Sequence, residues 1–320
     1  MLAPPLPAIP GYRILRRLGA GASGTVFHAI QEGTDREVAL KLFEPVDHPD
    51  ATRPEDVDRE RRVAASLRHR NLARIHAIGD YGDQRWLACE FLAGGTLSQR
   101  IAMRMPLAQV LDVVCDIARG LGHVHARGIV HGDVKPANVL FRGGRDPRTA
   151  NDAVLVDYGV AVFATDGRTT MQGGTPDYMS PEQARGGVID GRSDFYSLGV
   201  TLHEMLVGRV PLRDGNGELP SHRAIPRLPD RVHWLQPLLD TLLAEDPAER
   251  PDDTGALLDM LASLRLASPE AAVLDPAPRD EGLPRTYGVD ATPSSLRAWR
   301  WLALVLALAI GAAFAGWLLR

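Results

Sequence analysis

Short stretches that combine apolar and polar residues and look extended dominate the first third of the chain. Five of them have the length and composition of β-strands, at residues 12–18, 26–30, 37–43, 73–78 and 85–91. A helical pattern at 55–67 interrupts the series, and helical periodicity then prevails, as at 107–128 and 193–208. The pattern predicts a small sheet-rich lobe at about 11–91, followed by a larger helical lobe at about 95–268.

The C-terminal end carries a different pattern. Nineteen residues without a charge, 301–319, lie between Arg300 and Arg320. A helix of that length would be about 28 Å long, close to the roughly 30 Å hydrocarbon core of a bilayer. The alternative is a buried C-terminal helix, which usually keeps one polar face, and this segment has none. We therefore predict a transmembrane helix at 299–319, with tryptophans near both ends.

The residues that flank this span predict its orientation. Arg297 and Arg300 precede it, so the positive-inside rule places the preceding chain in the cytoplasm. Only Arg320 follows, and we expect no folded domain beyond the membrane. Residues 269–298 carry five prolines and little periodicity, which is typical of a juxtamembrane linker. Residues 1–10 have neither the basic residue nor the apolar run of a secretory signal.

Composition narrows the class of protein. The 320 residues are 45% hydrophobic and 24% charged, as expected for a folded globular chain. Since 36 Lys and Arg stand against 40 Asp and Glu, a nucleic-acid binder is not expected. Two cysteines, Cys89 and Cys115, are too few for a disulfide framework or a metal site, and indicate a reducing compartment.

A glycine-rich segment follows the first predicted strand. It reads Gly19-Ala20-Gly21-Ala-Ser-Gly24, and an extended stretch begins near Val26. A dinucleotide-binding turn would need a helix directly after the glycines. Because the following stretch looks extended, the segment is better interpreted as a hairpin lid over phosphates, where glycine lets backbone N–H groups come close.

Lys41 lies in the third predicted strand among apolar neighbours. Such a lysine can snorkel outward, but the glycine segment upstream favours a phosphate contact. A carboxylate is needed to hold it, and Glu60 on the following helix is the best candidate. The neighbouring acidic residues are solvated competitors: Glu55, Asp56 and Asp58.

Polar residues suited to catalysis are most concentrated in the segment 131–138. Asp133, Lys135 and Asn138 offer a proton acceptor, a cation for a phosphate and a metal ligand within six residues. Downstream, an apolar strand ends in Asp157. Mg²⁺ prefers one or two carboxylates together with substrate oxygens, so Asp157 and Asn138 are candidate ligands.

These motifs together resemble the eukaryotic-type (Hanks-type) serine/threonine protein kinases of bacteria, over residues 12–268. The resemblance implies an α+β, two-lobed protein kinase fold and the use of ATP with Mg²⁺, Mn²⁺ being an alternative. It implies that Lys41 holds the α- and β-phosphates and pairs with Glu60. Asp133 would accept the proton of the attacking hydroxyl, and Lys135 would neutralise the γ-phosphoryl group. The implied metal ligands are Asn138 and Asp157.

The same resemblance assigns the adenine site. The hinge would be Glu90 to Leu92, after Cys89 in the gatekeeper-like position. Val26 and Ala39 would contact the nucleotide together with the glycine segment, Gly19, Ala20, Gly21 and Gly24. The resemblance also implies that His131 packs under the catalytic loop rather than acting as an acid or base.

A second set of matches lies beyond the nucleotide site. The segment GTPDYMSPEQ, 174–183, resembles the substrate-binding segment of the family. Thr175 would hydrogen-bond near Asp133 and Lys135, a feature of Ser/Thr specificity. Glu182 would pair with Arg250 in a buried ion pair. A further match is the aspartate that braces the catalytic loop, Asp194.

Four positions depart from the family pattern. Gly132 replaces the arginine that normally pairs with a phosphorylated activation loop. Tyr158 replaces a phenylalanine in the metal-binding triplet. About six extra residues, starting near Arg142, are interpreted as a longer surface hairpin. Residues 213–230 are short and rich in Gly and Pro where a substrate-docking helix is usual.

The sequence therefore predicts a serine/threonine protein kinase that phosphorylates proteins and itself. We expect it to be a single-pass protein of the inner (cytoplasmic) membrane, anchored by its C-terminal helix, with the kinase domain at 11–268 in the cytoplasm. Dimerisation is compatible with the sequence. One alternative is a pseudokinase scaffold, which would usually lack the lysine or one of the aspartates. A small-molecule phosphotransferase is the other, and it would lack the 174–183 segment.

Overall fold

The structure is a computed structural model that describes residues 6–21, 24–43, 67–82, 84–143, 152–157, 162–163, 169–170, 174–211 and 225–267. All of them belong to one compact unit, Met1–Ala277. Several predicted features lie wholly or largely outside the described residues, among them Glu60 with nearly all of its helix, Tyr158, the linker at 269–298 and the transmembrane helix at 299–319. Among the helices of the described part, none has the length and apolar character needed to span a membrane.

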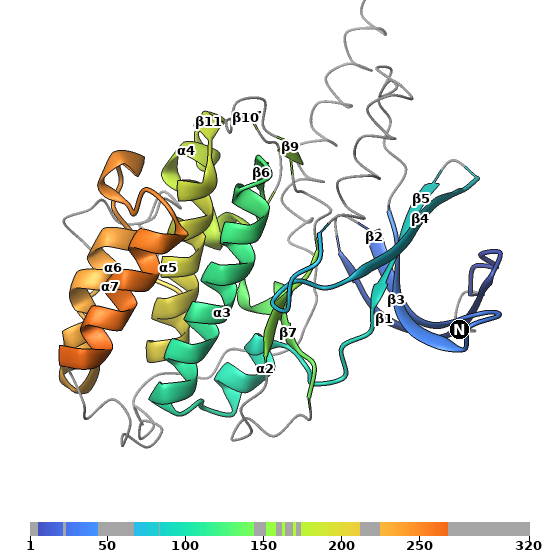
Figure 1. Ribbon diagram of the computed structural model, residues 1–320, viewed down its shortest axis with the longest axis horizontal. Coiled ribbons are helices and arrows are strands. Elements are labelled where there is room, and N and C mark those ends of the chain that lie inside the picture. The colour runs from blue at the N-terminus through green and yellow to red at the C-terminus, as the bar shows by residue number, and fades with distance from the viewer. Residues whose placement is uncertain are drawn as a thin grey trace, which may run out of the picture. The chain divides into compact units, whose positions relative to one another are not determined.

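The N-terminal part is one antiparallel sheet in the order β1-β2-β3-β5-β4 (Figure 1). Its strands confirm the five strand predictions, with small shifts at the ends. They are β1 (Tyr12–Gly21), β2 (Gly24–Gln31), β3 (Arg36–Leu42), β4 (Ile75–Tyr81) and β5 (Gln84–Glu90).

The alternating direction of the side chains along β3 shows which face of the sheet packs into the core. Val38, Leu40 and Leu42 are buried in an apolar cluster with residues of β1, β2 and β5. Successive side chains of a strand point to opposite faces, so Ala39 and Lys41 share the other face. One face of β3 therefore packs into the core, and its other face can bind a ligand.

The helical part is built around α5 (Gly191–Val207), whose side chains are nearly all buried. The Asp190 side chain accepts a hydrogen bond at its N-terminus, and Gly208 ends it with φ +83°, a left-handed conformation that glycine adopts without strain. Beside it lies α3 (Leu107–His125), as Figure 1 shows, and both confirm the predicted helices. The other helices are α2 (Leu97–Ala102), α4 (Pro181–Ala184), α6 (Gln236–Leu242) and α7 (Thr254–Ala267).

Short strand pairs hold the polar loops in place. The pairs are β6 (Ile129–Val130) with β9 (Val162–Phe163), β7 (Val139–Phe141) with β8 (Ala153–Leu155), and β10 (Thr169–Thr170) with β11 (Val188–Ile189). Four 3₁₀ turns accompany them in the described residues: η1 (Pro136–Asn138), η3 (Pro176–Tyr178), η5 (Asp230–Leu235) and η6 (Pro247–Glu249). The segment 131–138 therefore runs between β6 and β7, directly above the core of α3 and α5.

Candidate active site

Asp133 is the centre of a dense hydrogen-bond network. Its Oδ1 accepts the backbone N–H of Thr175 at 2.9 Å and the Thr175 hydroxyl at 2.8 Å. Its Oδ2 accepts Lys135 Nζ at 2.7 Å and Asn138 Nδ2 at 2.9 Å. Burial would raise the pKa of Asp133, but the bonds from Lys135, Thr175 and Asn138 hold it below its ordinary value. The carboxylate is therefore ionised at neutral pH and can accept a hydrogen bond from a hydroxyl.

Asp194, on α5, braces the backbone next to Asp133. Its fully buried carboxylate accepts the N–H of His131 at 2.9 Å and the N–H of Gly132 at 2.7 Å. His125 Nε2 lies 2.7 Å from the same carboxylate. This confirms the predicted bracing role. His125, in the last turn of α3, is a partner that sequence reasoning missed.

His131 is buried beneath the loop, as predicted. Its Nδ1 accepts the N–H of Asp133 at 3.3 Å, so its Nε2–H donates to the carbonyl of Val156 at 3.1 Å. Both ring nitrogens are thus occupied by backbone groups. The residue connects the segment 131–138 to the strand that leads to Asp157.

Lys41 forms an ion pair with Asp157, with 2.5 Å between Nζ and Oδ1. This contact joins β3 to the chain just after β8, and it was not predicted from the sequence. Asp157 has φ +67°, a conformation that few non-glycine residues adopt. The predicted partner of Lys41, Glu60, lies outside the described residues, so that pair stays a prediction.

Asn138 and Asp157 fit the demands of a magnesium ion. The side-chain hydrogen bonds of Asn138 to Asp133 use its amide nitrogen, which lies 2.8 Å from the Asp133 carbonyl oxygen and 2.9 Å from the Asp133 carboxylate. The amide oxygen is therefore the atom left for a metal. The described residues contain no group of three or more His, Cys, Asp or Glu that could hold an ion. A divalent ion here would need phosphate oxygens to complete its shell, which is typical of Mg²⁺.

Three of the predicted nucleotide-contacting residues, Val26, Ala39 and Lys41, lie on one face of the sheet. Gly19 pairs with Val26 across β1 and β2, and Val26 pairs with Lys41 across β2 and β3. Ala39, two residues before Lys41, has the same orientation. The glycine segment is a strand hairpin, with Gly21 opposite Gly24, and not a turn before a helix. The interpretation as a hairpin is therefore correct.

An apolar patch lies beside these residues. Leu92, directly after the Glu90–Phe91 segment, is buried in a cluster with Ala73 and Val154. Leu140 and Val156, partly buried, pack against the same cluster. Since Val156 precedes Asp157, the apolar patch and the Lys41–Asp157 ion pair are adjacent.

The segment 174–183 closes the site from the other side. Gln183 donates to the carbonyl of Gly132 at 3.0 Å, a contact that sequence reasoning missed. Glu182 and Arg250 form a bidentate ion pair at 2.6 and 3.0 Å, as predicted. The Arg250 side chain is fully buried. These contacts fix the segment so that Thr175 reaches Asp133 and Lys135.

Comparison with known proteins identifies the family. Residues 12–260 match the family model for the protein kinase domain, and the chain belongs to this family. The serine/threonine-protein kinase pkn2 of Myxococcus xanthus is 34% identical over 315 residues, covering 92% of this chain and 37% of that protein. PknJ of Mycobacterium tuberculosis is 32% identical over 301 residues, covering 89% of this chain. The chain spans only half of PknJ, 50% of its length.

A solved structure supports the same assignment. The kinase domain of Mycobacterium tuberculosis PknI has a TM-score of 0.63 and 28% sequence identity to this chain. The match covers 82% of this chain and 99% of that domain. The described part of the chain therefore has the protein kinase fold that the sequence predicts.

Proposed function

We propose that this chain is an ATP-dependent protein kinase that transfers the γ-phosphoryl group to Ser and Thr hydroxyls of proteins. The observation that carries the proposal is the network on Asp133. An ionised carboxylate is held by Thr175, Lys135 and Asn138 beside the Lys41–Asp157 ion pair. The names of the relatives, which are serine/threonine-protein kinases, point the same way.

In the proposed reaction the substrate hydroxyl attacks the γ-phosphorus, and the bond to the β–γ bridging oxygen breaks to release ADP. Asp133 orients the hydroxyl and takes its proton. Lys135 neutralises the transferring phosphoryl group, and Lys41 holds the α- and β-phosphates. Asn138 and Asp157 would hold Mg²⁺, which when bound neutralises charge on the phosphate oxygens. Catalysis is then mainly positioning and charge stabilisation.

The adenine would lie against the apolar patch of Leu92, Leu140 and Val156, received by the hinge at Glu90 to Leu92. Val26 and Ala39 would cover it from the sheet. The patch supports this placement because it is apolar and adjoins the ion pair that would meet the phosphates.

Both alternatives are less well supported. A pseudokinase usually lacks one of the charged groups, whereas Lys41, Asp133 and Asp157 are all present. A small-molecule phosphotransferase would have no use for the 174–183 segment, which here donates two hydrogen bonds to Asp133 through Thr175.

The proposal is tested with labelled ATP, Mg²⁺ and a basic protein acceptor. The variants Lys41→Met, Asp133→Asn and Asp157→Asn should each lower transfer by at least a hundredfold or so, about 2.7 kcal/mol, while circular dichroism remains unchanged. The matched control is Arg185→Ala, which removes an exposed ion pair with Glu245. Wild-type turnover in Asp133→Asn would show that the roles are misassigned.

We also propose that the kinase is tethered to the cytoplasmic membrane by residues 299–319. The uncharged segment and the arginines before it support this. The full chain should sediment with membranes after carbonate washing, and residues 1–298 should not. The linker at 269–298 would give the domain a reach on the order of 30 Å. Full chain in the soluble fraction without detergent would contradict the tether.

Autophosphorylation is the last part of the proposal. The candidate sites are Thr165, Thr169 and Thr170, before the 174–183 segment. The backbone of Thr169–Thr170 forms β10, and Thr165 lies outside the described residues. Mass spectrometry after incubation with ATP alone should find phosphate on this segment in wild type and none in Asp133→Asn.

A further inference from the structure

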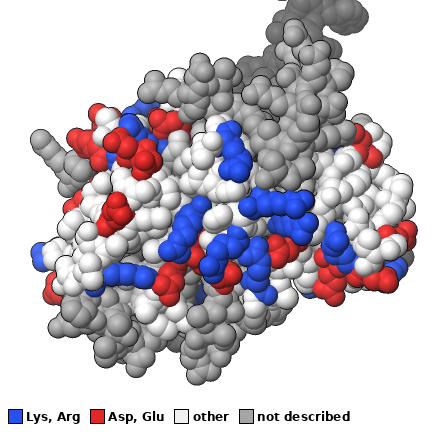
Figure 2. Space-filling model, in the orientation of Figure 1, with Lys and Arg blue, Asp and Glu red and all other residues white. Residues whose placement is uncertain are grey.

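The face drawn in Figure 2 carries many basic side chains across its middle, with acidic ones among them. The described residues also contain exposed ion pairs. Arg70 and Asp152, for example, are 65% and 39% exposed. Exposed pairs of this kind contribute little to stability, because water and salt screen them. A pair formed by Arg142 and Glu90 differs from them in burial, in geometry and in what it connects.

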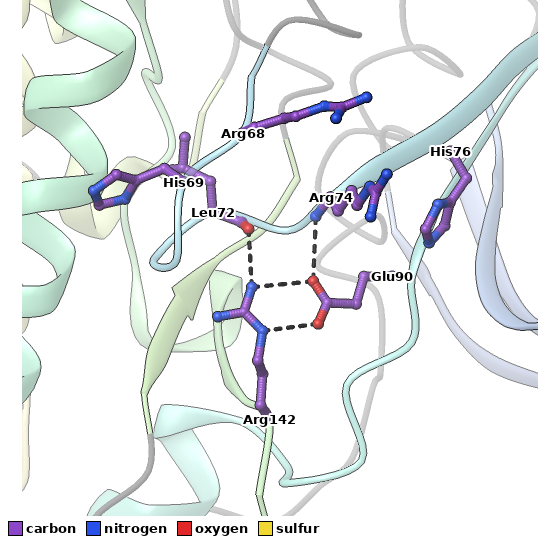
Figure 3. A pocket seen from close by; sticks show the side chains of 7 residues that line it. All are labelled: Arg68, His69, Leu72, Arg74, His76, Glu90 and Arg142. Atoms are coloured by element: carbon purple, nitrogen blue, oxygen red, sulfur yellow. Dashed lines mark hydrogen bonds and ion pairs between the residues drawn. The ribbon is translucent and has the colours of Figure 1, made fainter.

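Arg142 lies directly after β7 and beside a hollow of about 370 Å³ that Glu90 also lines (Figure 3). Its Nε donates to Glu90 Oε1 at 2.8 Å, and its Nη2 donates to Glu90 Oε2 at 3.1 Å. Nη2 also reaches the carbonyl of Leu72 at 3.2 Å, and Nη1 donates to the carbonyl of Arg70. The guanidinium is thus bound on two sides. The strands that flank the predicted hairpin, β7 and β8, are paired, and residues 144–151 of it lie outside the described residues.

Glu90 is the last residue of β5 and the first of the proposed hinge. Its backbone N–H donates to the carbonyl of Arg74 at 2.8 Å, and its carboxylate accepts the N–H of Arg74 at 3.3 Å. Burial would raise the pKa of Glu90, but Arg142 and the Arg74 N–H hold it below its ordinary value. In Figure 3 the Glu90 carboxylate faces the Arg142 guanidinium, while His69 and Arg68 point away from the pair.

The chain just beyond the hinge, at Gly94 and Gly95, is tied to the same strand. Gly94 N–H donates to the carbonyl of Phe141 at 2.8 Å, and Phe141 N–H donates to the carbonyl of Gly95 at 3.2 Å. A Cβ on Gly94 would lie 2.4 Å from the Phe141 carbonyl oxygen, so the close approach requires glycine there. Two consecutive residues therefore hold the chain on either side of the hinge: Arg142 holds Glu90 at its start, and Phe141 holds Gly94 and Gly95 just beyond its end.

We propose that Arg142 is a positioning residue that sets the affinity for the adenine of ATP by fixing Glu90 at the start of the hinge. The inference rests on the proposed function, since it assumes that the hinge receives adenine. Arg142 touches no nucleotide itself. It lowers the ordering cost of binding, because the hinge backbone is already held in one position before the nucleotide arrives.

The test separates adenine from phosphate recognition. In the full chain in detergent, inhibition of phosphoryl transfer is measured with two probes, adenosine and inorganic tripolyphosphate. Arg142→Ala should weaken adenosine binding and raise the KM for ATP about tenfold, 1.4 kcal/mol, with kcat within about twofold of wild type. Tripolyphosphate inhibition should stay unchanged. If Arg142 only stabilised the fold in general, Arg142→Ala would weaken inhibition by adenosine and by tripolyphosphate to the same extent.

Two further variants make the result specific. Arg142→Lys keeps the charge but loses the planar guanidinium that binds the carboxylate through two N–H groups. The affinity for adenosine should therefore lie between those of wild type and Arg142→Ala. Glu90→Gln keeps the volume and the backbone but loses the carboxylate, and should weaken adenosine as Arg142→Ala does. Because the two side chains act as one unit, the double variant should be no weaker than the worse single variant. If Arg142→Ala does not fold, adenosine inhibition of Glu90→Gln alone tests the proposal.

The matched control is Arg70→Ala. It removes the ion pair between Arg70 and Asp152, which also links the chain before β4 to the β7–β8 pair, but it leaves the hinge unchanged. Its kinetic constants should equal those of wild type. Unchanged adenosine binding in Glu90→Gln, equal loss for both probes, or an equal loss in Arg70→Ala would each overturn the inference. A wild-type chain that transfers no phosphate would instead overturn the proposed function.

Discussion

Replacement of Asp194 by asparagine tests how the catalytic loop is held. Asparagine has the same shape, but one of its two terminal atoms is a donor instead of an acceptor. In the wild type both carboxylate oxygens accept buried N–H groups, from His131 at 2.9 Å and Gly132 at 2.7 Å. Either orientation of the amide therefore leaves at least one buried N–H without a partner.

The expected loss of stability follows from these bonds. An unsatisfied buried donor costs about 1–3 kcal/mol, and the surviving bond loses its charge assistance. We expect the free energy of unfolding to fall by about 2–4 kcal/mol. The pKa of Asp194 is lowered in the fold because the bonds from His125 and the loop outweigh burial. Its stabilisation is thus fully present at neutral pH and is lost as the pH falls through the folded pKa, so the measurement belongs near pH 7.5.

Activity should fall further than stability alone explains. His131 and Gly132 directly precede Asp133, and a displacement of about 1 Å at a catalytic group costs about a hundredfold in rate. Urea unfolding followed by tryptophan fluorescence, and kcat at saturating ATP, are the two measurements. Asp253→Asn is the control, since the Asp253 carboxylate accepts the exposed N–H of Ala256 and asparagine caps a helix equally well. An unfolding free energy within about 0.5 kcal/mol of wild type would refute the bracing role.

Three further predictions concern stability and control. Arg250→Met should lower the free energy of unfolding by about 3–5 kcal/mol because it leaves Glu182 without its buried partner, and adding Glu182→Gln should restore part of the loss. Burial lowers the pKa of His203 to about 4, so the unfolded chain binds its proton first and stability should fall by about 3 kcal/mol between pH 6.5 and 4. The same pH scan of His203→Gln should be flatter, and equal slopes would contradict the assignment. Because Gly132 has no side chain to pair with a phosphate, phosphatase treatment should change the initial rate only a few fold, and a hundredfold loss would show that another cation orders the segment.

The local elements of this protein were readable from its sequence. The five strands follow from short, extended-looking stretches with apolar residues, and α3 and α5 follow from long helical periodicity. The glycine hairpin could be told from a dinucleotide turn because strand-forming residues, and not a helix, come next. The order of the charged motifs identified the family, since each motif is contiguous and its spacing is set by the local chain.

The tertiary structure alone decided which distant groups meet. Lys41 and Asp157 are 116 positions apart, and Asp194 lies 62 positions beyond the Gly132 N–H that it accepts. Resemblance to a family implied the second contact, whereas nothing in the sequence implied the first. Arg142 is the clearest example of a contact that could not be predicted from the sequence. Beside two glycines it has the local pattern of an exposed loop, because periodicity reports only the burial of nearby residues. Its contact with Glu90 depends on β7 lying against the end of the hinge, an arrangement that packing of the whole domain determines.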